Sequence, residues 1–323
     1  MIEHLESGIR ELVEDFIDAG KPCPSEQPIE ARRAGYRSTT TLAGKGPEMA
    51  QTFIDVVDGI TLKVFRPSDT SHLPITIYFH GGCFISGGFD THDQQLRQLA
   101  AESNNVVICV QYRLAPEYTY PAAHDDAYNA VVAIREMGSK YGGDTSRISL
   151  VGDSAGAHLA LVTTMRLKQR LGWLPVRQIL IYPMLDPHGS SASYKANATD
   201  YIITDKMLLS GFSLYLGDKS PQQVDNNPEL NPLVCGDFHG LPPTSIITAE
   251  FDPLRDEGEQ LYRQLLKHDV EAQCQRYLGV IHGFYQLSAV SQSAVRCISH
   301  IASELATSTK ASPNNIEKGH PHD

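Results

Sequence analysis

Short apolar runs alternate with longer stretches in which apolar residues recur every three or four positions, from about residue 50 to residue 307. The short runs are typical of buried strands, and the longer periodic stretches are typical of helices. Strands are predicted at Ile75–His80, Val106–Tyr112, Ile148–Gly152, Val176–Leu185, Ser245–Glu250 and Glu271–Tyr277. Helices are predicted between them at Thr91–Ser103, Ala122–Met137, Ala155–Leu171 and Arg255–His268, with a closing helix after His282.

Two more strands are predicted before this alternation begins. Thr52–Val57 and Ile60–Phe65 flank Asp58-Gly59, a residue pair that is strongly preferred in two-residue hairpin turns. Strands that alternate with helices form βαβ units, and the strands of such units run parallel. The pattern therefore predicts an α/β fold with a mostly parallel sheet that opens with an antiparallel hairpin.

One polar segment interrupts this rhythm. From Asp186 to about Asn231 the chain is rich in Ser, Asn and Pro around one apolar helix near Met207–Leu216. An insertion of this length between two core strands is a candidate lid. Near the N-terminus an amphipathic helix is predicted from apolar residues at helical spacing, namely Ile9, Leu12, Val13 and Phe16. We therefore expect a cap of residues 1–45 and 187–231, an α/β core of residues 46–186 and 232–310, and a disordered tail at residues 311–323.

The chain has 323 residues and a formal net charge of −11, from 27 Lys and Arg against 38 Asp and Glu. Nucleic-acid binding is not expected, because phosphate contacts need a basic face and no dense basic cluster is present. The N-terminus lacks the basic, apolar and small-residue order of a signal peptide, and no apolar stretch approaches the roughly 20 residues of a membrane helix. We therefore expect a cytoplasmic protein without a membrane span.

The six cysteines are widely spaced and contain no C-x-x-C pair. This spacing favours reduced thiols over a disulfide framework or a zinc site. His320 and His322 lie in the polar tail, where two histidines are expected to be inert rather than to hold a metal.

The sharpest local feature is Gly152-Asp153-Ser154-Ala155-Gly156, between a predicted strand and a predicted helix. In that context a Gly-x-Ser-x-Gly pattern places the serine on a tight turn, and the glycines remove side chains that would collide with neighbouring elements. The Ser154 hydroxyl is then expected to project from the C-terminal edge of the sheet as a nucleophile. The alternative is that Ser154 serves only as the N-cap of the helix.

A second feature, His80-Gly81-Gly82-Cys83-Phe84, follows directly on the strand that contains Ile75–Tyr78. Two glycines at a strand end leave backbone N–H groups able to approach a ligand. Together with the N–H of Ala155, the N–H groups of Gly81 and Gly82 are predicted to form an oxyanion hole. The alternative is a simple glycine turn.

A serine hydroxyl needs a base at neutral pH, and thirteen histidines compete for that role. His282 is favoured because it lies between the final predicted strand and the final helix. His158 lies four residues after Ser154 on the same helix, points away from the hydroxyl, and is interpreted as a packing residue. The others considered are interpreted as surface or solvated side chains: His124, His188, His239 and His300.

The base must in turn be oriented by a carboxylate. Asp252 follows the strand Ser245–Ala249 and precedes Pro253, which places it in a loop at the C-terminal end of that strand. Asp256 is interpreted as an acid of the first helical turn, and Glu250 stays an alternative to Asp252. The order Ser154, Asp252, His282 is that of α/β-hydrolases.

The motifs HGGCF, YRLAPE (Tyr112–Glu117), GDSAG and DPLRDE, in this order, resemble those of the hormone-sensitive-lipase group of α/β-hydrolases. Within that group the chain is most similar to bacterial acetyl esterases, and the similarity covers roughly residues 45–305. The resemblance implies an eight-stranded, mostly parallel sheet flanked by helices, with a helical cap over it. It also implies hydrolysis of short-chain acyl esters by Ser154, Asp252 and His282 without a metal or organic cofactor.

One position departs from the family pattern, which usually has a third glycine where this chain has Cys83. A Cβ restricts the backbone there and places a thiol beside the site or, alternatively, in the core. A non-catalytic ligand-binding or protein-interaction member of the fold and an amidase with the same triad stay alternatives. The natural ester and its acyl length are open, and a homodimer through an edge strand or the cap surface is one possible assembly.

Overall fold

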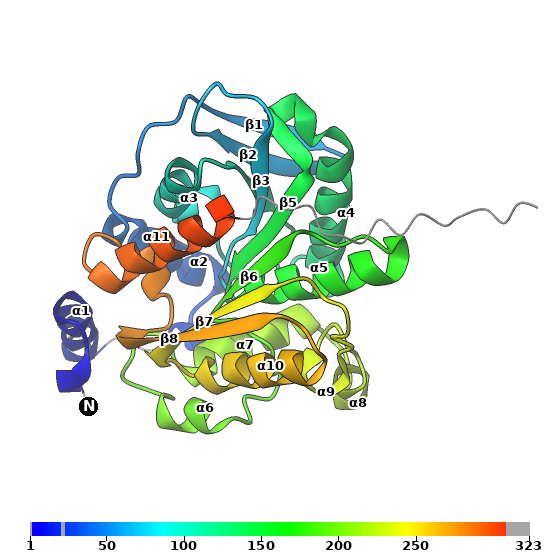
Figure 1. Ribbon diagram of the computed structural model, residues 1–323. Helices are drawn as coiled ribbons and strands as arrows, with labels where there is room; N and C mark the ends of the chain where they lie inside the picture. Colours follow the sequence, from blue (N-terminus) through cyan, green and yellow to red (C-terminus); the bar gives the residue numbers. More distant parts are fainter. Residues whose placement is uncertain (1, 21–22, 308–323) are drawn as a thin grey trace, which may run out of the picture.

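Eight strands form one sheet in the order β1-β2-β4-β3-β5-β6-β7-β8 (Figure 1). The structure is a computed structural model that describes residues 2–20 and 23–307. β1 pairs with β2, and β2 with β4, in antiparallel orientation, whereas all other neighbours are parallel. The mostly parallel eight-stranded sheet is thereby confirmed. The strands are β1 (Gln51–Val57), β2 (Ile60–Arg66), β3 (Leu73–Phe79), β4 (Val106–Gln111), β5 (Gly143–Asp153), β6 (Arg177–Ile181), β7 (Thr244–Phe251) and β8 (Ala272–Ile281).

The predicted hairpin turn lies between β1 and β2. Asp58 and Gly59 both have positive φ, 50° and 81°, and Val57 pairs with Ile60 on either side of them. Two left-handed residues in succession suit the right-handed twist of the flanking strands, and Asp and Gly tolerate that conformation better than most residues. The local sequence therefore explains this turn completely.

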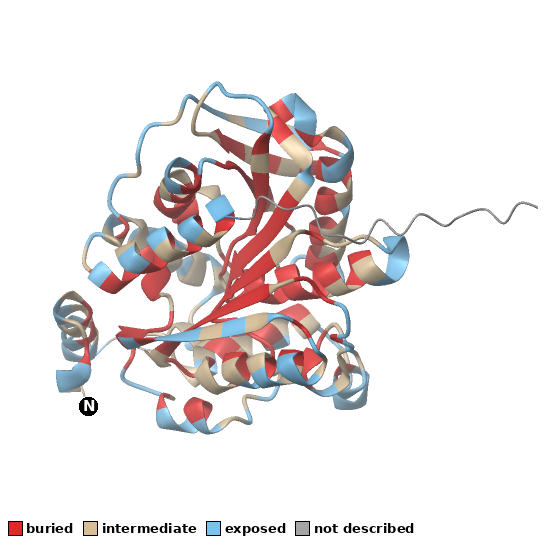
Figure 2. Ribbon diagram, viewed as in Figure 1, coloured by how far each residue is buried: buried red, intermediate tan, exposed pale blue. Residues whose placement is uncertain are grey.

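The central strands are apolar on both faces, which is why they appear in the sequence as continuous apolar runs. In β4, Val106 and Ile108 contact one apolar cluster, whereas Val107 and Cys109 contact a second cluster on the opposite face. Figure 2 shows these strands buried, with exposed residues gathered on the outer sides of the helices. One face is covered by α4 (Ala122–Met137), α5 (Ala155–Leu171) and α10 (Arg255–Lys267), and the other by α3 (Phe89–Ser103) and α11 (Gln292–Thr307).

The polar segment between β6 and β7 is helical over much of its length, with α6 (Ala192–Ala196), α7 (Asp205–Leu216), α8 (Pro221–Asp225) and α9 (Pro232–Cys235). Two helices precede the sheet, α1 (Ser7–Asp18) and α2 (Ile29–Ser38). Ile9 and Val13 of α1 are fully buried, as the amphipathic pattern predicts. Short 3₁₀ helices complete the described chain: η1 (Ile2–His4), η2 (Pro24–Glu26), η3 (Thr39–Leu42), η4 (Gly138–Tyr141) and η5 (Phe284–Gln286).

The bounds of three strands differ from the prediction by four residues or more, and those of the other strands by one or two. β8 continues to Ile281 instead of ending at Tyr277, because Gly279, with φ 72°, lies in an irregular stretch of the pairing with β7 rather than in a terminating turn. β6 ends at Ile181 instead of Leu185, since Tyr182 has φ 35° and leaves the strand although it is buried. β5 begins at Gly143, five residues before the apolar run.

The interpretation of His124 as a solvated side chain was wrong. His124 is 1% exposed and its Nδ1 lies 2.5 Å from the hydroxyl of Tyr215 in α7. Burial lowers the pKa of His124 well below its usual range, and the neighbouring His158 adds to this effect. A helical histidine in an otherwise ordinary amphipathic pattern gives no signal for such a contact, because Tyr215 is 91 residues away in the chain.

No helix within residues 2–20 and 23–307 combines the length and the apolar character needed to cross a membrane. All six cysteines are unpaired. The predicted tail at residues 311–323, with His320 and His322, lies outside the described residues.

Candidate active site

Ser154 stands at the sharp turn between β5 and α5. Its φ is 54° and its ψ is −118°, a conformation that L-residues rarely adopt. A Cβ at Gly152 would collide with the backbone of Gly156, and a Cβ at Gly156 would collide with the carbonyl of Phe79 at the end of β3. The two glycines therefore allow α5 to start close against β3 and β5. A hydrogen bond of 2.8 Å from the Ser154 N–H to the carbonyl of Ile181 fixes the turn.

The three predicted polar residues lie in one hydrogen-bonded line. His282 Nε2 is 3.1 Å from Ser154 Oγ, and His282 Nδ1 is 2.8 Å from Asp252 Oδ2. Because a carboxylate only accepts hydrogen bonds, the proton of a neutral His282 belongs on Nδ1, which leaves Nε2 as an acceptor for the serine hydroxyl. All three are buried, and the ring of Tyr182 packs on the imidazole at 4.6 Å between centroids.

The alternative acid, Glu250, does not take part in this line. Its Oε2 accepts the N–H of Gly279 in β8 at 2.7 Å, so its carboxylate holds the irregular part of the strand. The structure thus brings together Ser154, His282 and Asp252 and leaves Glu250 outside.

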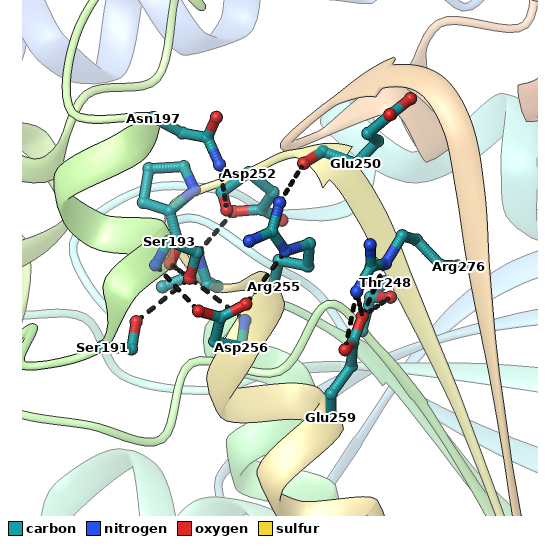
Figure 3. A network of polar contacts seen from close by, with 12 residues as sticks. Ser191, Ser193, Asn197, Thr248, Glu250, Asp252, Arg255, Asp256, Glu259 and Arg276 are labelled. Carbon is teal, nitrogen blue, oxygen red and sulfur yellow. Dashed lines mark hydrogen bonds and ion pairs between the residues drawn. The ribbon is translucent and has the colours of Figure 1, made fainter.

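The loop that carries Asp252 is held by its own helix and by the inserted segment (Figure 3). The N–H of Leu254 donates to Asp252 Oδ1 at 2.7 Å, which fixes the plane of the carboxylate. Asn197 donates to the carbonyl of Asp252 at 3.0 Å, and Ser193 Oγ donates to the carbonyl of Pro253 at 2.6 Å. No local pattern marks this support, since Ser and Asn are common throughout the insertion.

The predicted oxyanion hole needs one correction. The N–H of Gly81 donates to Asp153 Oδ1 at 2.8 Å, so it is not free to bind a ligand. The N–H groups of Gly82, Cys83 and Ala155 have no acceptor among residues 2–20 and 23–307. Gly82 and Cys83 have φ of 125° and 54°, and the carbonyl of Gly82 accepts the N–H of Ile85 and Ser86 in a tight turn. The N–H of Cys83 is therefore available in this loop, whereas the N–H of Gly81, which was predicted as a donor, is not.

Two residues that sequence reasoning did not single out position this loop. Asp153 is buried and accepts hydrogen bonds of 2.8 Å from Gly81 N–H and from the Tyr78 hydroxyl, and its Oδ1 lies 3.0 Å from His92 Nε2. Burial raises the pKa of Asp153, but His92 and these hydrogen bonds outweigh burial and lower it, so the carboxylate stays ionised. Tyr112 donates to the carbonyl of His80 at 2.6 Å. The available signals were the position of Asp153, directly before Ser154, and that of Tyr112 at the start of the YRLAPE motif.

An apolar cavity of about 420 Å³ lies over Ser154 and His282. Its walls come from the loop after β3 that carries Gly82 and Cys83, called here the oxyanion loop, and from α1, α2 and the insertion. The lining residues include Phe16, Tyr36, Cys83, Ile203 and Met207. A larger, polar groove of about 1060 Å³ lies around Gly87 and Arg113 and contains neither Ser154 nor His282. Within residues 2–20 and 23–307, no group of three His, Cys, Asp or Glu side chains is arranged to hold a metal ion.

The thiol of Cys83 lines this cavity and is half-buried. Burial raises its pKa to about 11, whereas at Cys23 the hydrogen bonds from Ser25 and Thr204 outweigh burial and lower the pKa. Because the thiolate is the nucleophile, iodoacetamide at pH 7.5 is expected to modify Cys23 at least about tenfold faster than Cys83. Peptide mass spectrometry of a time course measures both rates. Faster labelling of Cys83 than of Cys23 would contradict the inference that the Cys83 thiol has the higher pKa.

Comparisons with known proteins identify the family of this chain. The model of the alpha/beta hydrolase fold family matches residues 76–286. Carboxylic ester hydrolase LipN of Mycobacterium tuberculosis is 35% identical over 273 residues, with 80% of this chain and 71% of that protein covered. Ethyl acetate hydrolase of Pseudomonas putida is 32% identical over 295 residues, with 88% and 92% covered. The solved esterase of Pyrobaculum calidifontis matches with a TM-score of 0.87 and 33% identity, with 94% of this chain and 98% of that chain covered. The chain belongs to the alpha/beta hydrolase fold family, and within it to the carboxylic ester hydrolases.

Proposed function

We propose that this protein is a serine carboxylesterase that hydrolyses short-chain, acetyl-type esters through an acyl-enzyme intermediate. The observation that carries the proposal is the hydrogen-bonded line of Asp252, His282 and Ser154, which opens onto an apolar cavity. The names of the relatives support an ester as the substrate. No residue of this mechanism requires a cofactor.

In the proposed first step, Ser154 Oγ attacks the ester carbonyl carbon while His282 Nε2 takes the hydroxyl proton. The carbonyl oxygen becomes an oxyanion, which accepts hydrogen bonds from the N–H groups of Gly82, Cys83 and Ala155. Loss of one such donor typically costs about 3–4 kcal/mol of barrier. His282 then gives its proton to the leaving alkoxide, and the acyl group stays on Ser154.

In the second step, water attacks the acyl-enzyme while His282 takes a proton from it, and collapse of the new oxyanion releases the acid and returns the proton to Ser154. Asp252 keeps the proton of the neutral imidazole on Nδ1 and stabilises the imidazolium that forms in each half-reaction.

We further propose that residues 1–45 and 187–231 act as a cap over this site. Phe16 and Tyr36 come from the first segment and Met207 from the second, and all three line the cavity beside Ser154. The limited volume under these helices supports a short acyl group. The cytoplasmic location and the homodimer stay predictions of the sequence.

A series of p-nitrophenyl esters from acetate to laurate tests the substrate class. We expect kcat/KM to be highest for the short acyl chains and at least about tenfold lower for laurate, because a long chain does not fit a cavity of about 420 Å³. A fluorophosphonate probe is expected to label Ser154, as located by peptide mass spectrometry. Rising kcat/KM up to laurate would contradict the short-chain assignment, and lack of labelling would favour a non-catalytic binding protein.

A further inference from the structure

Arg32 of α2 brings a positive charge into a cavity that is otherwise mostly apolar. It is the sole Lys or Arg among the described residues that line the cavity over Ser154. Its Nη2 donates to the carbonyl of Met207 at 3.3 Å and to Ser210 Oγ at 3.0 Å, both in α7. These contacts orient the side chain, but neither partner carries a negative charge.

No carboxylate within residues 2–20 and 23–307 forms an ion pair with Arg32, and its Nε and Nη1 have no hydrogen-bond acceptor there. The other arginine of this helix that approaches the site, Arg33, pairs instead with Glu117 at 2.6 Å. Arg32 is half-buried, and burial lowers its pKa because it removes water from the charged form. An anionic ligand would replace the water around the remaining donors and pair with the charge.

The position of Arg32 places this charge near the reacting atoms. Ser210, one of the two α7 residues that it contacts, adjoins Gly211, where an added Cβ would lie 2.6 Å from the Cβ of Cys83. Cys83 in turn follows Gly82 in the oxyanion loop, and the charge of Arg32 lowers the pKa of the Cys83 thiol against the larger effect of burial. A group held by Arg32 therefore lies within the same cavity as an ester carbonyl at Ser154.

The cavity offers little negative charge to oppose such a ligand. Asp153 is the one Asp or Glu among the described lining residues, and its carboxylate is already occupied by His92, Tyr78 and the Gly81 N–H. The net charge of −11 repels anions at long range, but salt screens that field over about 10 Å, whereas a contact inside a cavity is screened much less.

We propose that Arg32 makes this site select esters that carry a carboxylate close to the scissile bond. This inference rests on the proposed ester hydrolysis and narrows its substrate class. The carboxylate can belong to the acyl half, as in a monoester of a short dicarboxylic acid, or to the alcohol half, as in an acetylated hydroxy acid. Both present the same group to the same guanidinium.

Paired substrates test the inference. The measured quantity is the ratio of kcat/KM for a charged ester to kcat/KM for its neutral partner. For the acyl half, the pair is mono-p-nitrophenyl glutarate and p-nitrophenyl valerate. For the alcohol half, the pair is 3-acetoxybenzoate and phenyl acetate. Arg32→Gln is expected to lower at least one of these ratios by about 10- to 100-fold through KM, and to change kcat/KM for the neutral esters by less than about threefold. The substrate pair whose ratio falls shows whether the carboxylate belongs to the acyl half or to the alcohol half.

Arg37→Gln is the matched control, because Arg37 lies on the same helix and does not line this cavity. It should leave both ratios unchanged. Equal slowing of charged and neutral esters by Arg32→Gln, or unchanged ratios, would overturn the inference and leave Arg32 as a tie between α2 and α7. If the wild type hydrolyses neither the charged nor the neutral esters, the proposed function itself is wrong.

A measurement on the wild-type protein keeps the inference testable if Arg32→Gln does not fold. At 500 mM NaCl, where the long-range field of the net charge is screened, the wild type should still hydrolyse the charged ester of at least one pair with a higher kcat/KM than its neutral partner. A charged-to-neutral ratio at or below one for both pairs under these conditions would contradict a role for Arg32 in selection. Arg32→Lys, which keeps the charge, should retain most of the wild-type ratio.

Discussion

Replacing Ser154 with alanine is expected to lower kcat for p-nitrophenyl acetate by about 10⁶-fold, the loss typical of removing the nucleophile of a triad. The substitution removes Oγ and keeps Cβ, so the turn between β5 and α5 loses only the atom that His282 Nε2 faces at 3.1 Å. Circular dichroism should show an unchanged fold. Residual activity above about 1% of the wild-type value would contradict the assignment of Ser154 as the nucleophile.

Ser154→Gly separates the chemistry of this position from its backbone strain. Glycine adopts φ near 54° without the steric cost that serine and alanine share there. Ser154→Gly should therefore be as inactive as Ser154→Ala but about 1 kcal/mol more stable to unfolding. Urea denaturation of the two variants measures the difference. A less stable glycine variant would show that the turn carries no strain of this kind.

Local sequence patterns were sufficient to predict the sheet and the turn that carries Ser154. The strands could be predicted because both faces of the sheet are covered, which makes runs such as Val106–Gln111 apolar without interruption. The turn could be predicted because Gly152 and Gly156 are required by close backbone approach, and that requirement is visible as two glycines at fixed spacing. In both cases the cause leaves a mark in the local sequence, although the backbone that Gly156 approaches belongs to Phe79 in β3.

The parts that could not be predicted depend on contacts between distant residues. The N–H of Gly81 is taken by Asp153, which is 72 residues away, and two adjacent glycines do not show which of their N–H groups is free. The approach of Arg32 to α7 joins residues 178 apart, and no local pattern marks an arginine that will lack a counter-ion. The irregular pairing at Gly279 misled the prediction because a glycine after a strand usually marks its end.

Asp252→Asn is expected to lower kcat by about 10⁴-fold by forcing the wrong tautomer on His282. The N–H of Leu254 donates to Oδ1 of residue 252, so the amide oxygen of asparagine must take that position. The amide NH₂ then faces Nδ1 of His282, where the wild-type protein has Oδ2 at 2.8 Å. An NH₂ group donates, so Nδ1 becomes an acceptor and the imidazole proton moves to Nε2. An imidazole protonated at Nε2 cannot take the proton of Ser154.

Glu250→Gln is the matched control for Asp252→Asn, because it makes the same chemical change in the alternative acid, which lies at the end of β7. The Glu250 carboxylate accepts the N–H of Gly279, and a glutamine oxygen can accept that hydrogen bond equally well. We expect Glu250→Gln to keep kcat for p-nitrophenyl acetate within about threefold of the wild-type value. If Glu250→Gln were inactive and Asp252→Asn kept kcat within tenfold of the wild-type value, Glu250 would be the acid that orients His282. The fully buried position of Asp252, against the partly exposed position of Glu250, favours the opposite result, because an imidazolium that forms in a buried site needs its counter-ion there.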